Sequence, residues 1–143
     1  MFTFGRDNEI KTALRRHGGP DRASQIVDIV NAVHDLQEGK GSVERVEATI
    51  LSALIEGRRD IWGAAGTWLL KMQVDFPACR RVWLELATHE SAEVRFRVAC
   101  HLTDFPRDLQ GEIYAILKND KSKRVRTHLE GKWDYCQNPE KYA

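Results

Sequence analysis

SAEVRFRVACHL occupies residues 91–102, and a related segment, DKSKRVR, occupies residues 120–126. When the two are aligned at a shift of 31 positions, the serine, the valine and the arginine of the Val-Arg pair each fall on an identical residue. The preceding VWLEL at 82–86 falls on IYAIL at 113–117 in the same register. One pair of helices cannot bury its apolar stripe alone, so repeated pairs stack and share a core. The repeat therefore predicts stacked helix pairs.

Turn-forming residues divide the whole chain into segments of similar length. They occur at 17–20, 38–41, 56–57, 75–77, 90–91, 104–106 and 119–120. Between them, apolar residues recur at three- and four-residue spacing, as at Ile26, Ile29, Val30 and Val33, which is the pattern of a helix with one buried face. No segment sustains a period-two alternation, so no strand is predicted. The predicted helices span 7–16, 22–37, 42–56, 60–73, 78–89, 92–103, 107–118 and 122–135.

Local signals support these boundaries. Ser42 is predicted to cap the free amides of the third helix, and Asp21 those of the second. Two Asp-Phe-Pro turns are predicted to end helices, because the residue before proline avoids the α region, and to let the next helix begin just beyond. Their phenylalanines, Phe76 and Phe105, are expected to pack between helix layers.

The segment at 91–102, with its short polar turn, Val-Arg pair and small residue before a leucine, resembles the second helix of a HEAT-type repeat of the compact bacterial variety. The similarity covers about 74–135, is weaker over 42–73 and leaves 1–41 assigned by periodicity alone. It implies an all-α fold, a right-handed α-solenoid of about four HEAT-like antiparallel helix pairs in a single domain, 1–143. The pairs are roughly 7–37, 42–73, 78–103 and 107–135. Family members are chiefly protein-binding scaffolds, and the arginine of the Val-Arg pair often bonds an aspartate of its own stack.

Composition restricts the function classes. The 143 residues are 42% hydrophobic and 30% charged, and their net charge of +1 argues against a generally electrostatic nucleic-acid binder. Cys79, Cys100 and Cys136 form no CxxC pair and follow no signal-peptide pattern, so we expect reduced thiols in the cytoplasm. The longest apolar runs fall far short of the roughly 20 residues that span a bilayer, which argues against a membrane-spanning role.

Catalytic and metal-binding motifs are missing from the sequence. His89-Glu90 is the only adjacent His-Glu pair, whereas HEAT-like iron hydroxylases use several such pairs. The chain contains no HExxH, no GxSxG, no phosphate loop and no GxGxxG. We therefore expect no enzyme activity, no metal and no cofactor.

Charge is unevenly distributed along the chain. From 28 to 56, six acidic residues stand against two basic ones. We predict a protein-binding module, in a concrete form an immunity or antitoxin-like protein that masks the basic active site of a toxin. Its predicted contact residues are Asp28, Asp35, Glu38, Glu44 and Glu47.

A basic C-terminal face supports an alternative function. Second helices line the concave side of a HEAT-like solenoid, so cations on them could converge there. The alternative basic face consists of Arg95, Arg97, His101, Arg124, Arg126, His128 and Lys132. It predicts a nucleic-acid-binding or DNA-repair protein, with Trp62 or Trp68 supporting an exposed nucleotide. Trp83 and Trp133 are predicted to be core, and a structural subunit of a larger assembly is a third possibility.

Overall fold

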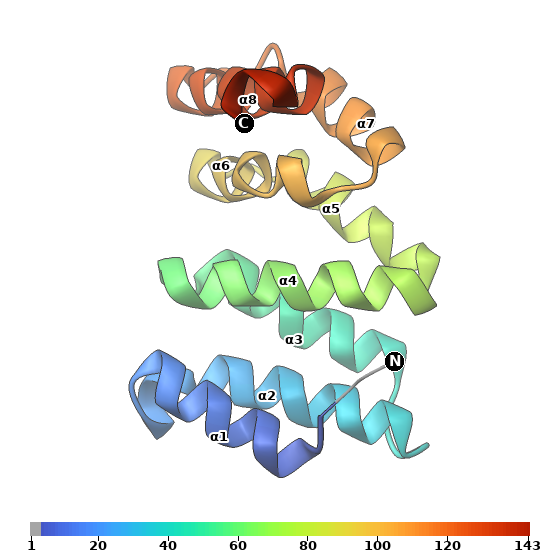
Figure 1. Cartoon of the computed structure of the whole chain (residues 1–143). Coiled ribbons are helices and arrows are strands. Elements are labelled where there is room, and N and C mark those ends of the chain that lie inside the picture. The colour runs from blue at the N-terminus through green and yellow to red at the C-terminus, as the bar shows by residue number, and fades with distance from the viewer. Residues whose placement is uncertain (1–3) are drawn as a thin grey trace. The chain divides into compact units, whose positions relative to one another are not determined.

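The computed structural model describes residues 4–143, and all regular structure in this part of the chain is helical (Figure 1). It contains eight α-helices and three short 3₁₀ helices in this range. The predicted all-α fold class is confirmed. Contacts between residues divide the chain into two compact units, Met1–Cys79 and Arg80–Ala143.

The first unit consists of two antiparallel helix hairpins. Its helices are α1 (Arg6–His17), α2 (Pro20–Gln37), α3 (Val43–Glu56), α4 (Arg59–Asp75) and the 3₁₀ turn η1 (Pro77–Cys79). α2 packs against α1, α3 and α4, so it is the central helix of the unit (Figure 1). The predicted stripe on α2 is buried: Ile26, Ile29, Val30 and Val33 are each at most 3% exposed.

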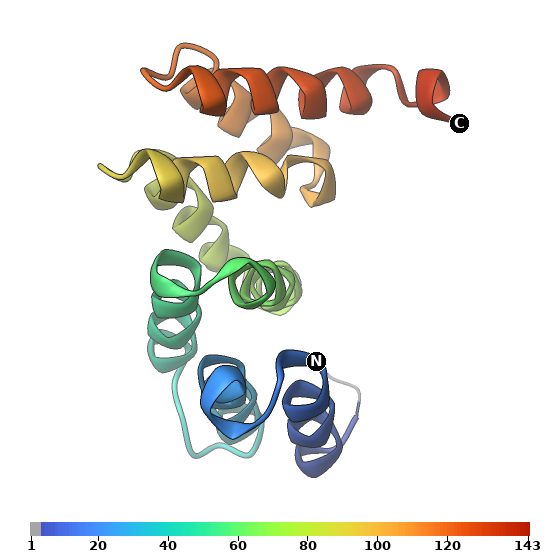
Figure 2. The same ribbon diagram turned by 90° about the vertical axis from the view of Figure 1, so that its left-hand side faces the viewer.

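The second unit repeats the pairwise arrangement. Its elements are α5 (Arg80–Ala87), α6 (Ala92–Cys100), η2 (Leu102–Asp104), α7 (Arg107–Leu117), α8 (Lys123–Gln137) and η3 (Pro139–Tyr142). α6 lies alongside α8 (Figure 2), and α5 contacts α7. Val98 and Leu129, which the repeat places at equivalent positions, are 1% and 0% exposed.

Most of the predicted boundaries are accurate to within two residues. The predicted helices 78–89 and 92–103 each contain a 3₁₀ turn, η1 before α5 and η2 after α6. Ser42 caps α3 as predicted, since its hydroxyl accepts a hydrogen bond from the Arg45 amide at 3.1 Å. The two Asp-Phe-Pro turns end α4 and η2, and Phe105 is buried against Trp83 at a ring-centroid distance of 4.7 Å.

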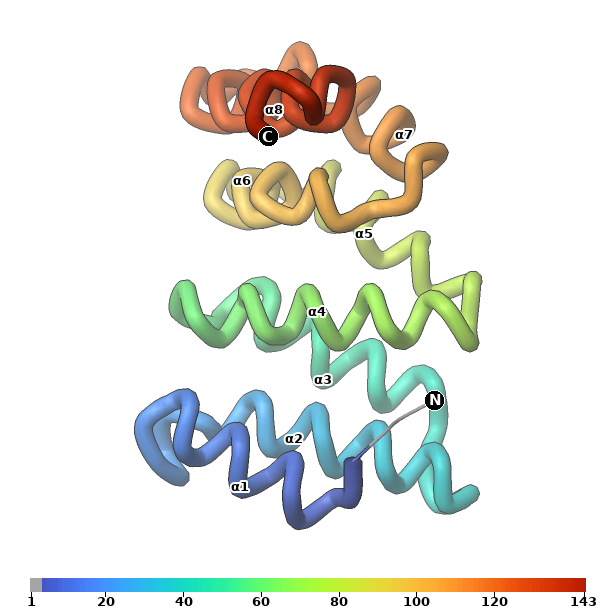
Figure 3. Tube along the Cα trace, viewed as in Figure 1, coloured from blue at the N-terminus to red at the C-terminus, as the bar shows by residue number. Residues whose placement is uncertain are grey.

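The predicted cap by Asp21 is wrong. α2 begins at Pro20, two residues before the predicted start at 22, because proline already has the backbone angle of a first helical residue. Gly18 and Gly19 precede it with φ of 88° and 100°, a left-handed conformation that glycine adopts without strain. They make the tight turn between α1 and α2 that the chain trace in Figure 3 follows.

None of the helices in residues 4–143 combines the length and the apolar character needed to cross a bilayer.

Candidate ligand-binding groove

An open groove in the second unit, with a volume of about 920 Å³, brings cations and aromatic side chains together. It lies along α6 and α8, which run side by side in Figure 2. The lining residues are Phe96, Thr103, Lys123, Arg124, Thr127, His128, Gly131, Lys132, Tyr135 and Tyr142. Three lining residues carry a permanent positive charge: Lys123, Arg124 and Lys132, all on α8. The groove wall therefore favours an anionic ligand.

The register of α8 explains why these side chains share one side of the helix. Val125 and Leu129 are both fully buried in the unit. Arg124, His128 and Tyr135 follow at four and then seven residues, a spacing that keeps them on one side next to the buried stripe. Packing the two apolar residues in the core therefore turns the polar and aromatic residues toward the groove.

Arg124 is held loosely enough to exchange its partner. Its guanidinium lies 2.6 Å from a carboxylate oxygen of Glu93 and 3.7 Å from the centroid of the Phe96 ring. The side chains of Arg124 and Glu93 are 60% and 47% exposed, and such surface ion pairs contribute at most about 1 kcal/mol. An incoming anion can compete with Glu93 for this guanidinium, while Phe96 keeps the guanidinium at the groove.

Two tyrosines border the groove at its C-terminal end. Tyr135 and Tyr142 are 45% and 53% exposed, and their ring centroids are 5.3 Å apart. Asp134 holds η3 against α8, because it accepts hydrogen bonds from the Tyr142 hydroxyl, the Lys141 ammonium and the Asn138 amide. These bonds, that of Tyr142 above all, keep the pKa of Asp134 below its ordinary value of 3.8. The exposed rings can stack on planar groups or cover apolar side chains.

His128 connects α8 to α6 at the groove. Its Nε2 lies 3.4 Å from the Sγ of Cys100, and its ring lies 4.8 Å from that of Phe96, measured between centroids. These contacts fix the imidazole as part of the wall. Across residues 4–143, no three potential His, Cys, Asp or Glu ligands gather as a metal cluster would require.

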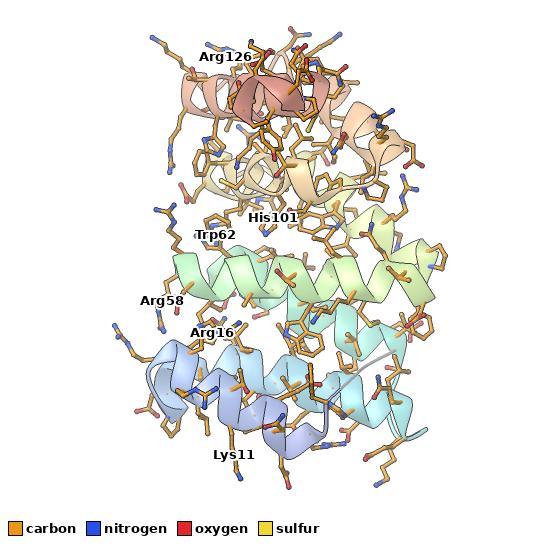
Figure 4. All side chains as sticks on the ribbon, in the orientation of Figure 1. Lys11, Arg16, Arg58, Trp62, His101 and Arg126 are labelled. Atoms are coloured by element: carbon orange, nitrogen blue, oxygen red, sulfur yellow. The ribbon has the colours of Figure 1, made fainter. Side chains whose placement is uncertain are left out.

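Arg95 and Arg126, predicted for the basic face, are used within the unit instead. The Nε and Nη2 of Arg95 donate to Asp120 at 2.7 and 3.2 Å, and its Nη1 donates to the carbonyl oxygens of His89 and Glu90. Arg126, labelled in Figure 4, donates to the carbonyl oxygen of Asp120. The structure thus contains, at Arg95, the arginine–aspartate pairing that the family resemblance implied. Arg95 therefore stabilises the turns before α6 and before α8, and Arg126 stabilises the turn before α8.

His101 and Arg97 also lie outside the groove lining. His101 is buried, its Nδ1 is 2.8 Å from the carbonyl oxygen of Arg97, and its ring packs on Trp83 at a centroid distance of 5.0 Å. Figure 4 places it on the side of α6 away from α8. The Arg97 side chain is only 13% exposed and lies 3.7 Å from Glu93. Of the predicted basic face, the structure brings Arg124, His128 and Lys132 together in the groove.

The predicted acidic contact residues lie in the first unit, and two of them are in ion pairs. Asp35 accepts hydrogen bonds from Arg6 at 2.7 Å and from Arg45 at 2.6 Å. These bonds, that of Arg45 first, lower the pKa of Asp35 from 3.8 to about 2. Glu38 lies 2.8 Å from Arg6 and 3.8 Å from Lys40. Both carboxylates are therefore largely neutralised inside the unit.

The other three acidic residues differ in exposure. Glu47 is buried at 9% exposure, so little of its surface can reach a partner. Asp28 and Glu44 are exposed on α2 and α3.

The tryptophans divide between core and surface. Trp83 is fully buried, as predicted. Trp133 is only half-buried and stacks on Tyr114 at 4.2 Å between ring centroids. Trp62 is 9% exposed, whereas Trp68 is half-buried and lines a groove in the first unit.

Comparison of the chain with protein-family models, with curated proteins and with solved structures found no match.

Sequence reasoning missed part of the groove. Lys123, Tyr135 and Tyr142 were not among the predicted site residues, although Tyr135 continues the spacing of Arg124 and His128 along α8. A helical projection of 122–137 around Val125 and Leu129 could have identified Tyr135. Tyr142 could not be found this way, because it reaches the groove only through the turn into η3.

Proposed function

We propose that the chain is a non-catalytic protein-binding module whose groove on α6 and α8 takes an acidic segment of a partner protein. The observation that carries this proposal is the meeting of three cations and three aromatic rings in one open groove. Lysine and arginine bind carboxylates through charge-assisted hydrogen bonds. Exposed aromatic rings bury apolar side chains. An acidic stretch with interspersed aliphatic residues meets both requirements.

The charge balance of the two units supports this choice of surface. Residues 80–143 contain twelve Lys and Arg against ten Asp and Glu, whereas residues 1–79 contain ten against eleven. The groove therefore lies in the more basic unit. In the other unit, Asp35 and Glu38 are already in ion pairs, which lowers their value for attracting a partner.

The length of the groove indicates the length of the segment. From Lys123 to Tyr135, α8 advances by about 18 Å at its rise of roughly 1.5 Å per residue. An extended chain advances about 3.3 Å per residue. The groove therefore accommodates about five or six residues of an extended partner segment.

We further propose that the four helix pairs stack as a right-handed HEAT-like solenoid, in line with the repeat at 31 positions. Within the first unit α2 packs on α4, and within the second α6 packs on α8, so second helices of successive pairs are neighbours in each unit. A solenoid of this kind offers its second helices to a partner.

Charge reversal in the groove tests the proposed function. The double variant K123E/K132E should bind a fluorescent peptide of about ten residues, alternating glutamate and leucine, at least about tenfold more weakly than wild type, a loss of roughly 1.4 kcal/mol. The reason is that two groove cations become repulsive toward the peptide. Affinity is measured by fluorescence anisotropy at two salt concentrations.

K118E/K121E is the matched control, since both of these exposed lysines lie just before α8 and outside the groove lining. K118E/K121E changes the net charge by the same amount as K123E/K132E, but it should bind the peptide with an affinity within about twofold of wild type. Equal weakening in both double variants would mean that the peptide responds to overall charge, and the groove proposal would then be wrong.

Binding of single-stranded nucleic acid is the second candidate function. It is favoured by the exposed rings of Tyr135 and Tyr142 beside Lys132, because bases stack on aromatic side chains while lysines contact phosphates. Titration with a fluorescent oligothymidine, under the same conditions as the peptide, distinguishes nucleic-acid binding from binding of an acidic protein segment. Affinity that falls steeply with salt and is lost in Y135A would favour nucleic acid.

The immunity hypothesis stays a prediction within this proposal. A toxin would be neutralised through an acidic segment that enters the groove, or through Asp28 and Glu44, two exposed residues of the predicted acidic contact set. Cys79, Cys100 and Cys136 are not in disulfide bonds, as expected for the cytoplasmic location that the sequence predicts.

A further inference from the structure

A second groove, in the first unit, contains a different set of groups. It has a volume of about 430 Å³, within the range of small-molecule sites. α1 and α4 both pack on α2 (Figure 1). The groove is lined by residues of these three helices and by Phe4. Its lining residues are Phe4, Asn8, Glu9, Thr12, Ala13, Arg16, His17, Ile26, Val30, Ala64, Thr67, Trp68 and Lys71.

The walls of this groove combine an apolar floor with one large aromatic ring. Ile26 and Val30 of α2 are almost fully buried and form the floor. Ala64 on α4 is small and leaves room above it, while the half-buried Trp68 supplies an indole wall. A planar ring fits such a slot, because it buries both faces against apolar groups.

Two cations stand at the same groove. Lys71 lies over the Trp68 ring, with its Nζ 5.0 Å from the ring centroid. Arg16 is exposed and projects from α1 toward α4 (Figure 4). Glu9 opposes them, but its carboxylate is 3.5 Å from Nε2 of His34 and its side chain is only 11% exposed. The accessible charge of the groove is therefore positive.

His17 is a buried and oriented polar group in the wall. Its side chain is 4% exposed, and its Nδ1 lies 2.9 Å from Oδ2 of Asp60. Arg58 fixes this arrangement, because it donates to the His17 carbonyl oxygen at 2.9 Å and its Nε lies 2.8 Å from Asp60. With Nδ1 engaged, Nε2 is the ring nitrogen left for a molecule in the groove. A carboxylate that holds one nitrogen of an imidazole sets the direction of the other.

We propose that this groove binds a small planar aromatic anion, a fused ring system that carries one carboxylate. The ring lies against Trp68 over the apolar floor. The carboxylate contacts Lys71 and Arg16, and Nε2 of His17 forms a hydrogen bond with the ligand. This site is independent of the groove on α6 and α8 and does not rest on the function proposed for it.

Titration of the full chain with 2-naphthoate, followed by amide NMR shifts, tests the site. Shifts should concentrate on α1 and α4 around the groove. 2-Naphthoate should bind at least about tenfold more tightly than the neutral 2-naphthamide, because only the acid engages the cations. Equal affinities for the two compounds, shifts confined to α8, or no binding of naphthoate would each overturn the proposal.

Two double variants that each remove two positive charges test whether Arg16 and Lys71 contact the carboxylate of the ligand. R16M/K71M keeps the long apolar stems and removes both cations, so the preference for naphthoate over naphthamide should disappear. R15M/R59M is the control, with one exposed arginine removed from each of the same two helices outside the groove lining. It should keep the preference. Loss of the preference in the control alone, or in neither variant, contradicts the assignment.

His17→Asn separates binding from structure. The asparagine amide lies where Nδ1 was and still donates to Asp60, but nothing replaces Nε2. Thermal unfolding should stay close to wild type while naphthoate affinity falls severalfold. An H17N variant that binds naphthoate like wild type would remove His17 from the site.

Discussion

At the scale of single residues, Asp120 illustrates how one buried carboxylate fixes a turn. Its side chain is 6% exposed, it receives two hydrogen bonds from Arg95, and its Oδ1 accepts the Ser122 amide at 2.9 Å. Burial acts to raise the pKa of Asp120, but the hydrogen bonds of Arg95 and Ser122 outweigh it, and the pKa is below the ordinary 3.8. The ionised carboxylate therefore stabilises the entry into α8.

Replacing Asp120 with asparagine should lower the free energy of unfolding by about 2–3 kcal/mol at neutral pH, because the buried guanidinium of Arg95 loses its counter-ion. A depressed folded-state pKa contributes stability that is present above the unfolded value of 3.8 and is lost as the pH falls through the lower folded value. The difference in free energy of unfolding between wild type and D120N should thus become smaller below about pH 4.

Urea unfolding of both proteins across this pH range measures the effect. A gap that stays constant down to about pH 3 would show that the carboxylate charge is irrelevant to the turn.

At the scale of elements, α8 combines a stable buried stripe with an open groove face. Gly131 lies in the middle of α8, where glycine costs roughly 1 kcal/mol relative to alanine. A Cβ at this position would meet nothing within 4 Å, so no contact inside the protein requires the glycine. Gly111 in the interior of α7 is equally unconstrained, and it does not line the groove.

G131A and G111A should therefore each raise the free energy of unfolding by about 0.5–1 kcal/mol. Only G131A should weaken binding of the glutamate–leucine peptide, since its methyl group enters the groove. Chemical unfolding measures the free energy of unfolding of each variant, and fluorescence anisotropy measures its affinity for the peptide. Stabilisation by both variants with equal peptide affinity would indicate that the partner does not approach α8 at Gly131.

The elements were largely predictable because their signals are local. Breakers such as Gly18, Gly19 and the two Asp-Phe-Pro turns act within a few residues, and buried positions such as Val98 and Leu129 follow helical spacing. The site was less predictable. Whether an arginine is free for a ligand depends on carboxylates distant in sequence: Arg95 bonds Asp120, and Arg6 bonds Asp35. Spacing alone could not distinguish these arginines from those that face a groove.

At the scale of the whole molecule, each unit contributes a groove of its own. The second unit carries the larger groove, lined by lysines, arginine and tyrosines, and the first carries the smaller one beside Trp68. A net charge of +1 over the chain conceals this local concentration of cations. The composition argued against a general nucleic-acid binder, yet it gave no indication of a basic groove, because a net charge sums over acidic residues such as Asp35 and Glu38 that lie in the other unit.

We propose that a partner segment binds along α6 and α8. Amide NMR spectra of the full chain, recorded during titration with the glutamate–leucine peptide, test it most directly. We predict saturable shifts concentrated at Phe96 and along Lys123–Tyr135, and a loss of these shifts when glutamine replaces glutamate in the peptide. Saturable shifts concentrated instead on α2 and α3 around Asp28 and Glu44, or no saturable shifts at low salt, would contradict the claim.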